Sequence, residues 1–243
     1  MKIKFNIYNV LILLLVAVFL FSGFMLVKTI IIGKQEQADF EQIATLVKPA
    51  DPTPEKTGPE RDISAVLAQN PDTIGWIYIK DTVIDYPVMH TPLEPQKYLR
   101  LSFGGQKSSA GTPFMDYRCN LDSNHILIYA HNMKNGTMFN QLRWYRSLEY
   151  LRNNPIIEFH TQNKTTKYSV FAVATLKGDD PWYLNTNLET PQEYQKQIEY
   201  IKSKALFETG VTPQYPAKIL TLSTCVNGND DSERYIVVAA EVN

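Results

Sequence analysis

A long uncharged run lies at the start of the chain. From Phe5 to Val27 no residue is charged, and most are Leu, Ile, Val or Phe. At about 1.5 Å per residue, a helix of this length crosses a hydrocarbon core of roughly 30 Å. A cleavable signal peptide has a shorter apolar core of about 7–15 residues. We therefore expect an uncleaved signal-anchor over residues 5–32, after a short cytoplasmic tail of residues 1–4.

The charges that flank this run bear on its orientation. Lys2, Lys4 and the terminal amine favour a cytoplasmic N-terminus, while Lys28 and Lys34 act in the opposite direction. Because so few residues precede the run, the bulk of the chain lies on its C-terminal side. We expect the N-terminus inside, which places the remainder of the chain outside the cytoplasm.

Beyond the anchor, apolar residues recur first at helical spacing. Over residues 35–47 they fall on one face, which predicts a short amphipathic helix. Prolines between positions 49 and 59 break any continuation, so residues 33–61 are interpreted as a juxtamembrane helix and a Pro-rich spacer. A further short helix is expected over residues 62–70, with a proline directly after it.

The remainder of the chain favours strands. Runs rich in β-branched and aromatic residues, each bounded by turn formers, predict strands. They are Trp76–Ile79, Val83–Val88, Ile126–Ala130, Ile156–His160, Lys167–Leu176, Ile219–Ser223 and Tyr235–Val242. Helical spacing returns over residues 191–207, and a shorter helix is expected over 141–151. Roughly seven or eight short strands with few helices predict a mainly β fold, a closed or nearly closed barrel.

Composition and charge exclude several classes of protein. A length of 243 residues suits one domain of about 200 residues with an appendage. The net charge of −1 gives no basic excess for phosphate groups, which excludes nucleic acid as a leading partner. Two cysteines are too few for a disulfide framework or a zinc site, so no metal is expected. The acidic stretch 227–233 lacks the register of a calcium-binding EF-hand loop and is interpreted as a solvated loop.

Three residues near predicted strand ends can do chemistry together. Cys225 ends one run, His131 ends another ahead of a turn, and Arg234 immediately precedes the final strand. A thiolate attacks a carbonyl, an imidazole moves protons and a guanidinium donates to a developing oxyanion, a set that suits acyl transfer. Each residue also has a plain structural alternative, since cysteine is often a small buried hydrophobe and a lone His or Arg is often solvated. Cys119 lies in a turn-like segment without an obvious base and is expected to be a bystander.

Several short segments carry a resemblance to a known family. Thr221-Leu-Ser-Thr-Cys225 resembles the TLxTC signature of sortases, the membrane-anchored cysteine transpeptidases of Gram-positive bacteria. Four further blocks resemble class B sortase segments in the family's order. They are Asn70–Trp76, Ile84–Val88, Gly111–Tyr117 and Ala130–Phe139. The resemblance is therefore to class B sortases, and it covers residues 70 to 240.

This resemblance implies an eight-stranded β-barrel with short N-terminal helices, one preceding transmembrane helix and a helix in the loop between strands six and seven. The catalytic domain would span residues 62–243. Cys225 matches the family nucleophile, His131 the general acid/base and Arg234 the arginine that steadies the substrate and the tetrahedral intermediate. The family needs no metal or organic cofactor. The resemblance also implies substrate-binding positions at Ser223, Thr224, Asn132, Tyr183 and Leu184.

The implied reaction is a two-step acyl transfer at the outer face of the cell membrane. Cys225 would cleave an NPxT-type sorting signal of a surface protein after Thr and hold the fragment as a thioester, which the amine of a lipid-linked peptidoglycan precursor resolves. Three alternatives stay open: a pilin lysine as the acceptor, a plain thiol protease that uses water, and a non-catalytic anchored barrel that binds surface proteins. Val226 and Asn227 stand where many class B members carry an acidic residue, so the preferred signal also stays open.

Overall fold

The computed structural model describes residues 7–50, 60–227 and 230–242. The expected tail of residues 1–4, most of the Pro-rich spacer and the tip of the acidic loop lie outside the described residues. By its internal contacts the chain divides into two compact units, residues 1–39 and residues 40–243.

The first unit consists of most of α1 (Ile7–Ala44), a helix of 38 residues. Its most apolar 18-residue window has a mean hydropathy of 3.1 and no buried residue. Among the described residues, α1 is the one helix long and apolar enough to cross a membrane. The separate amphipathic helix expected over 35–47 is wrong in its start, because α1 continues unbroken to Ala44 and no proline occurs before Pro49.

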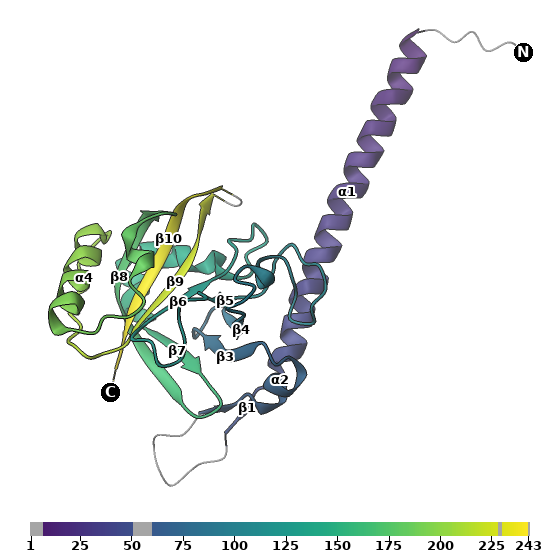
Figure 1. Cartoon of the computed structure of the whole chain (residues 1–243). Helices are drawn as coiled ribbons and strands as arrows, with labels where there is room; N and C mark the ends of the chain where they lie inside the picture. Colours follow the sequence, from purple (N-terminus) through teal and green to yellow (C-terminus); the bar gives the residue numbers. More distant parts are fainter. Residues whose placement is uncertain (1–6, 51–59, 228–229, 243) are drawn as a thin grey trace, which may run out of the picture. The chain divides into compact units, whose positions relative to one another are not determined.

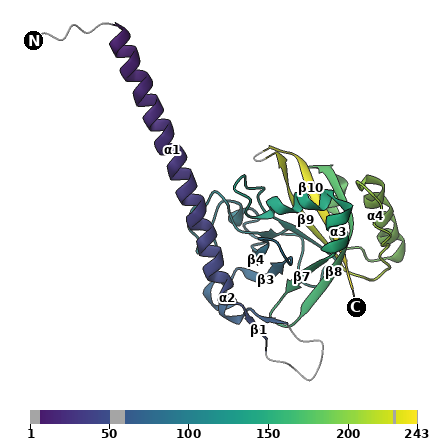
Figure 2. The same ribbon diagram turned by 180° about the vertical axis from the view of Figure 1, so that it is seen from behind.

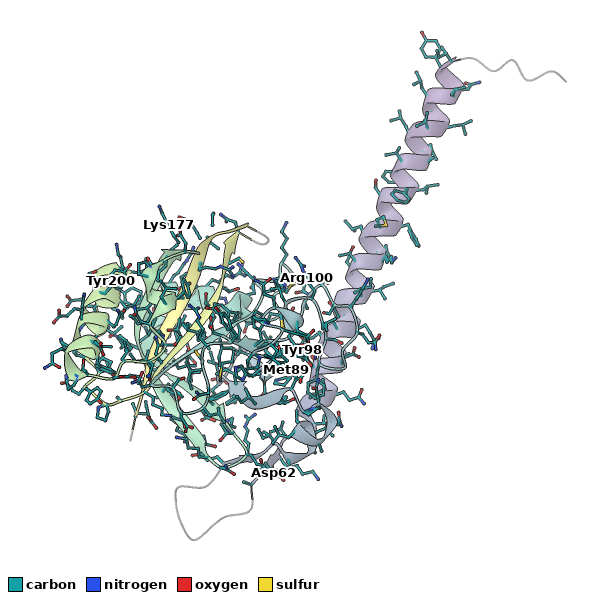
Figure 3. All side chains as sticks on the ribbon, in the orientation of Figure 1. Asp62, Met89, Tyr98, Arg100, Lys177 and Tyr200 are labelled. Carbon is teal, nitrogen blue, oxygen red and sulfur yellow. The ribbon has the colours of Figure 1, made fainter. Side chains whose placement is uncertain are left out.

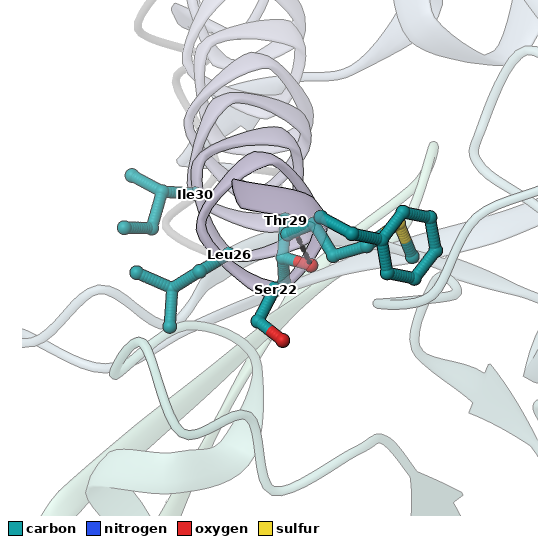
Figure 4. Close-up of a pocket in the computed structure, with 6 residues that line it drawn as sticks. Ser22, Leu26, Thr29 and Ile30 are labelled. Atoms are coloured by element: carbon teal, nitrogen blue, oxygen red, sulfur yellow. Dashed lines mark hydrogen bonds between the residues drawn. The ribbon is translucent and has the colours of Figure 1, made fainter. Parts of the chain in front are cut away.

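A shallow groove on α1 carries the few polar side chains of this region (Figure 4). Thr29 Oγ1 donates to the carbonyl of Met25 at 2.9 Å, one turn earlier. Such a bond satisfies the hydroxyl within its own helix. The groove is formed by the side chains of a single helix, so it is not a candidate functional site.

In the described part of the second unit, eight strands close into a barrel (Figure 1). The order around it is β10-β8-β7-β3-β4-β5-β6-β9, with β4–β5 and β6–β9 parallel and the other pairs antiparallel. The expectation of an eight-stranded barrel is confirmed. The strands are β3 (Thr73–Tyr78), β4 (Asp85–Met89), β5 (Phe114–Met115), β6 (His125–Tyr129), β7 (Ile156–His160), β8 (Thr165–Lys177), β9 (Ile219–Asn227) and β10 (Asp230–Glu241), while β1 (Lys48–Pro49) and β2 (Arg61–Asp62) pair separately.

Short helices connect the strands (Figure 2). α4 lies between β8 and β9, the sixth and seventh barrel strands, as expected. Thr190 and Glu193 form a reciprocal capping box at its start, and Tyr194, Ile198 and Ile201 form its buried face. The helix expected over 141–151 is two elements, because extended backbone at Ser147 separates them. The short helices are α2 (Ser64–Gln69), η1 (Lys97–Leu99), η2 (Phe139–Arg146), α3 (Leu148–Asn153), η3 (Pro181–Leu184) and α4 (Pro191–Lys204).

The core of the second unit fills the barrel and the space beneath its short helices. Figure 3 shows Met89 and Tyr98 in this packed interior and Arg100 toward the outside. Phe40, in the last turns of α1, is buried and packs edge-on against Tyr86 with ring centroids 5.2 Å apart. The second unit therefore includes the end of α1 as well as the barrel.

Candidate active site

Cys225 and Arg234 face each other across the β9–β10 hairpin. They are paired in the register of these antiparallel strands, and Arg234 Nη1 lies 3.4 Å from Cys225 Sγ. Side chains directly opposite on such a pair project to the same face. The prediction that Arg234 precedes the final strand is wrong: β10 begins at Asp230, and Arg234 lies inside it, because β9 continues to Asn227 and the two strands go on pairing beyond Cys225.

His131 reaches the same edge of the sheet from a different strand. β6 runs parallel to β9, with Tyr129 paired to Ser223. His131 and Cys225 each come two residues after a member of that pair. Because neighbouring parallel strands carry their carboxyl ends to the same edge, the fold brings the imidazole and the thiol to one region although 94 positions separate them.

A backbone carbonyl orients the His131 ring. Nε2 lies 2.9 Å from the carbonyl oxygen of Leu99. A carbonyl oxygen only accepts, so Nε2 carries the hydrogen and Nδ1 is the basic nitrogen of the neutral ring. Burial lowers the pKa of His131, and the positive charges of Arg100 and Arg234 lower it further, although the bond to Leu99 opposes them. The ring is therefore neutral at pH 7 and able to accept a proton.

The carbonyl that orients His131 depends on a glycine. Gly111 has a φ of +62°, and a Cβ placed there would lie 2.7 Å from the carbonyl oxygens of both Tyr98 and Leu99. An alanine at this position meets rigid backbone in a conformation that L-residues rarely adopt. We expect Gly111→Ala to lower the free energy of unfolding by about 1–3 kcal/mol and to reduce activity as the Leu99 carbonyl shifts. Thermal unfolding measures the first effect.

Gly105 offers a matched control for this substitution. Its φ is +78°, but a Cβ there meets nothing within 4 Å. Gly105→Ala therefore carries the conformational strain without the collision, and we expect a smaller loss of stability with normal activity. Equal effects of the two substitutions on stability and activity would contradict a contact-specific role for Gly111.

Cys225, His131 and Arg234 all line one cavity, which has a volume of about 390 Å³. It is lined by residues from the segments 95–100, 114–118, 129–131 and 178–184, together with Cys225 and Arg234. Of the positions expected to bind substrate, Tyr183 and Leu184 are in this lining, and Leu184 is 67% exposed. A cavity of this size, open at a barrel edge, suits an extended peptide of a few residues.

Ser223, Thr224 and Asn132 lie outside the cavity lining. Ser223 is fully buried with its hydroxyl 3.1 Å from that of Tyr183, and Thr224 Oγ1 donates to the carbonyl of Ala130 at 2.8 Å. Asn132 Nδ2 donates to the carbonyls of Cys225 at 2.9 Å and Val226 at 3.2 Å. In this structure the three side chains hold neighbouring segments together: Asn132 and Thr224 join the His131 segment to β9.

Part of the cavity wall is a polar group that the sequence pattern did not indicate. Arg118 donates two hydrogen bonds to Asp116, at 2.8 and 2.7 Å, and the Tyr129 hydroxyl donates a third at 2.9 Å. Burial alone would raise the pKa of Asp116, but the bonds from Arg118 and Tyr129 outweigh it and lower the pKa. The carboxylate stays ionised and paired. Asp116 and Arg118 lie in or beside a block quoted above, yet nothing in their spacing predicts this contact.

The second cysteine lies apart from this chemistry. Cys119 is buried, its Sγ lies 3.4 Å from the carbonyl of His125, and burial raises the pKa of its thiol to about 12. A thiol so far from ionisation is a poor nucleophile at neutral pH. Among the described residues, no group of three or more His, Cys, Asp or Glu side chains is placed to hold a metal ion.

Comparison with known proteins identifies the family. The family model for the sortase domain matches residues 77–242, so the chain belongs to the sortase family. Sortase B of Listeria monocytogenes is 30% identical over 100% of this chain and 99% of its own length. Sortase B of Staphylococcus aureus is 31% identical over 95% of this chain and 94% of its own length.

The solved structures agree with the sequence relatives. A Staphylococcus aureus sortase B–substrate complex superposes with a TM-score of 0.74 at 26% identity, covering 87% of this chain and 98% of that one. Clostridium perfringens sortase B superposes with a TM-score of 0.68 at 30% identity, covering 74% of this chain and 99% of that one. Within the family the chain is a class B sortase, which confirms the resemblance. Its membership supports a transpeptidase that anchors surface proteins.

Proposed function

We propose that this class B sortase is a cysteine transpeptidase in which Cys225 is the nucleophile, His131 the general acid/base and Arg234 the oxyanion donor. The observation that carries the proposal is the 3.4 Å contact between Arg234 Nη1 and Cys225 Sγ, in a cavity that His131 also lines. The substrate is an NPxT-type sorting signal of a surface protein, cleaved after Thr, and the cavity holds the residues around the scissile bond.

The first step forms a thioester. Nδ1 of His131 takes the thiol proton, and Cys225 Sγ attacks the carbonyl carbon of the Thr residue. Negative charge moves onto the carbonyl oxygen, where Arg234 donates to it. The C–N bond then breaks, and His131 returns its proton to the departing amine nitrogen. The acyl fragment is left on Cys225, and the C-terminal fragment leaves with a free amine.

The second step joins the fragment to an acceptor amine. The amine nitrogen attacks the thioester carbon while His131 removes one of its protons, and Arg234 again stabilises the oxyanion. The C–S bond breaks, the proton returns to the Cys225 sulfur and a new amide is formed. No oxidant, metal or organic cofactor enters either step. The acceptor in this proposal is the amine of a lipid-linked peptidoglycan precursor.

In this proposal the N-terminal segment places the reaction at the membrane surface. We assign residues 5–32 to the membrane anchor, with the N-terminus inside and the catalytic domain, residues 62–243, on the outer face. The length and hydropathy of α1 support the anchor, since an 18-residue window has a mean hydropathy of 3.1. Anchoring confines the enzyme to the plane that holds the exported protein and the lipid-linked acceptor, which raises their effective concentration.

The proposal is tested on the full-length protein in detergent micelles with a panel of NPxT-type peptides. We expect mass spectrometry to detect an acyl adduct on Cys225, and an added oligoglycine amine to convert it into a ligated product. Conversion by a lysine-bearing peptide and not by the oligoglycine would overturn the peptidoglycan acceptor in favour of a pilin-type one. A failure of every peptide to form an adduct, while a small alkylating reagent modifies Cys225, would overturn the proposed function.

A further inference from the structure

One wall of the cavity is a short loop segment between β8 and α4. Its residues Tyr183 and Leu184, in η3, line the cavity together with Asp179 and Asp180. Leu184 is largely exposed, so it has little packing of its own to hold it in place. The position of this wall relative to Cys225 depends on what fixes the residues on either side of it.

The residues on either side of Tyr183 and Leu184 are both linked to one buried histidine, one of them directly and the other through Thr221. His125, at the start of β6, is 1% exposed. Its Nδ1 lies 2.6 Å from the carbonyl oxygen of Asn185, and its Nε2 lies 2.9 Å from Thr221 Oγ1. Thr221 Oγ1 in turn accepts a hydrogen bond from Trp182 Nε1 at 3.3 Å. Trp182 and Asn185 are the residues immediately before and after the pair that lines the cavity.

The chemistry of these partners determines the protonation of the ring. The Asn185 carbonyl only accepts, so Nδ1 of His125 carries a hydrogen, and Nε2 accepts from the Thr221 hydroxyl. Burial lowers the pKa of His125 to about 4, which keeps the ring neutral at pH 7. The ring also packs against Trp182, with centroids 4.7 Å apart. A neutral imidazole thus satisfies an acceptor on one side and a donor on the other.

One face of β9 carries Cys225 and also the residues that contact this wall of the cavity. Residues at alternate positions of a strand share a face, so Thr221, Ser223 and Cys225 point the same way. Thr221 bonds to Trp182, and the Ser223 hydroxyl lies 3.1 Å from that of Tyr183. The wall is thereby placed against the strand that carries the thiol, by contacts two and four residues away from it.

A second set of contacts holds the loop from the side of α4. Tyr200, labelled on α4 in Figure 3, donates to Asp180 at 2.8 Å. Asp180 also caps the start of η3 by accepting from the backbone N–H of Trp182 at 2.9 Å. With these contacts in place, loss of the His125 bonds is expected to displace η3 locally and to leave the remainder of the loop attached.

We propose that His125 is a positioning residue for substrate binding, which through Thr221 and Asn185 holds Tyr183 and Leu184 at their distance from Cys225. The inference rests on the proposed function, in which the sorting-signal peptide occupies the cavity beside this wall. His125 is not among the residues that line the cavity, so its contribution is to the affinity for the peptide. The chemistry at Cys225 does not depend on it.

The test compares His125→Phe, which keeps an aromatic ring but removes both hydrogen bonds, with His125→Asn, which keeps a donor for the Asn185 carbonyl. We expect His125→Phe to raise KM for the sorting peptide roughly tenfold or more with kcat little changed, because displaced binding groups weaken substrate capture. His125→Asn should recover part of the loss. The rate of alkylation of Cys225 by a small reagent should be unchanged in both.

His160 provides the matched control. It is also fully buried, but its Nδ1 bonds to Thr165 Oγ1 at 2.8 Å, and neither residue lines the cavity. His160→Gln should leave KM unchanged. A folded His125→Phe protein with a normal KM, or one that loses kcat and alkylation rate together, overturns the proposal.

Hydrogen exchange distinguishes this inference from the proposed function. In His125→Phe, amides of residues 182–185 should exchange faster while those of β9 stay protected. This readout needs no turnover, so it stands even where no peptide is a substrate. Unchanged exchange at residues 182–185 in a folded variant overturns the positioning role.

Discussion

Cys225→Ala is expected to abolish cleavage and transfer of a sorting peptide. The substitution removes the sulfur atom proposed to carry the acyl group, so the fall in kcat/KM should be on the order of 10⁴-fold or more. The fold should survive, because Cys225 is a small side chain at 7% exposure near the end of the β9–β10 pairing. Peptide turnover followed by mass spectrometry, with thermal unfolding as a check on folding, measures both.

Cys119→Ala is the control for this result. Its thiol is buried away from the cavity lining, with a pKa raised to about 12, so its removal should cost little activity. Together the two variants separate loss of the nucleophile from loss of a buried sulfur. Equal losses in both variants, or normal turnover by Cys225→Ala, would falsify the assignment of Cys225 as the nucleophile.

Arg234→Lys is expected to lose about 10²–10³-fold in kcat/KM while retaining its charge. The guanidinium presents several N–H donors in a rigid plane, one of which already lies 3.4 Å from Cys225 Sγ. An ammonium on a flexible stem cannot reproduce that arrangement at a developing oxyanion, and loss of one such donor typically costs a factor of this size. Single-turnover acylation kinetics measure the effect directly.

Two controls distinguish the loss of an oxyanion donor in Arg234→Lys from other effects of the substitution. Alkylation of Cys225 by a small reagent should change far less than acylation, because lysine still places a positive charge near the sulfur. Arg100→Lys, at an exposed arginine of the same cavity, should acylate at a near-normal rate. Near-normal acylation by Arg234→Lys would mean that a positive charge is sufficient at this position. That result would contradict the proposed role of Arg234 as the oxyanion donor.

The strands show how much of the fold can be predicted from the local sequence pattern. Residues 156–160 were predicted as a strand, and β7 has those same bounds, because a run rich in β-branched and aromatic residues lies between turn formers. β5, with only Phe114 and Met115, was missed, since two residues cannot display an alternation. Closure of the barrel depends on that short strand, which joins β4 to β6.

The ends of elements were less predictable than their existence. Arg234 was expected before the final strand, yet β10 extends back past it to Asp230. The charged residues there lack a strand-like pattern. Their pairing with β9, and not their own propensity, makes them part of the sheet.

By itself the sequence determined the barrel class, the anchor-like helix and the three residues proposed for the chemistry. The signals were runs rich in β-branched and aromatic residues, a long uncharged run, and several segments that resemble one family. Only the tertiary structure decided what surrounds them. The Tyr129 hydroxyl on Asp116, the Leu99 carbonyl on His131 and the bonds of His125 join residues 13 or more positions apart along the chain. Such contacts leave no periodicity in the sequence, since strand register and barrel closure, not neighbouring residues, bring the partners together.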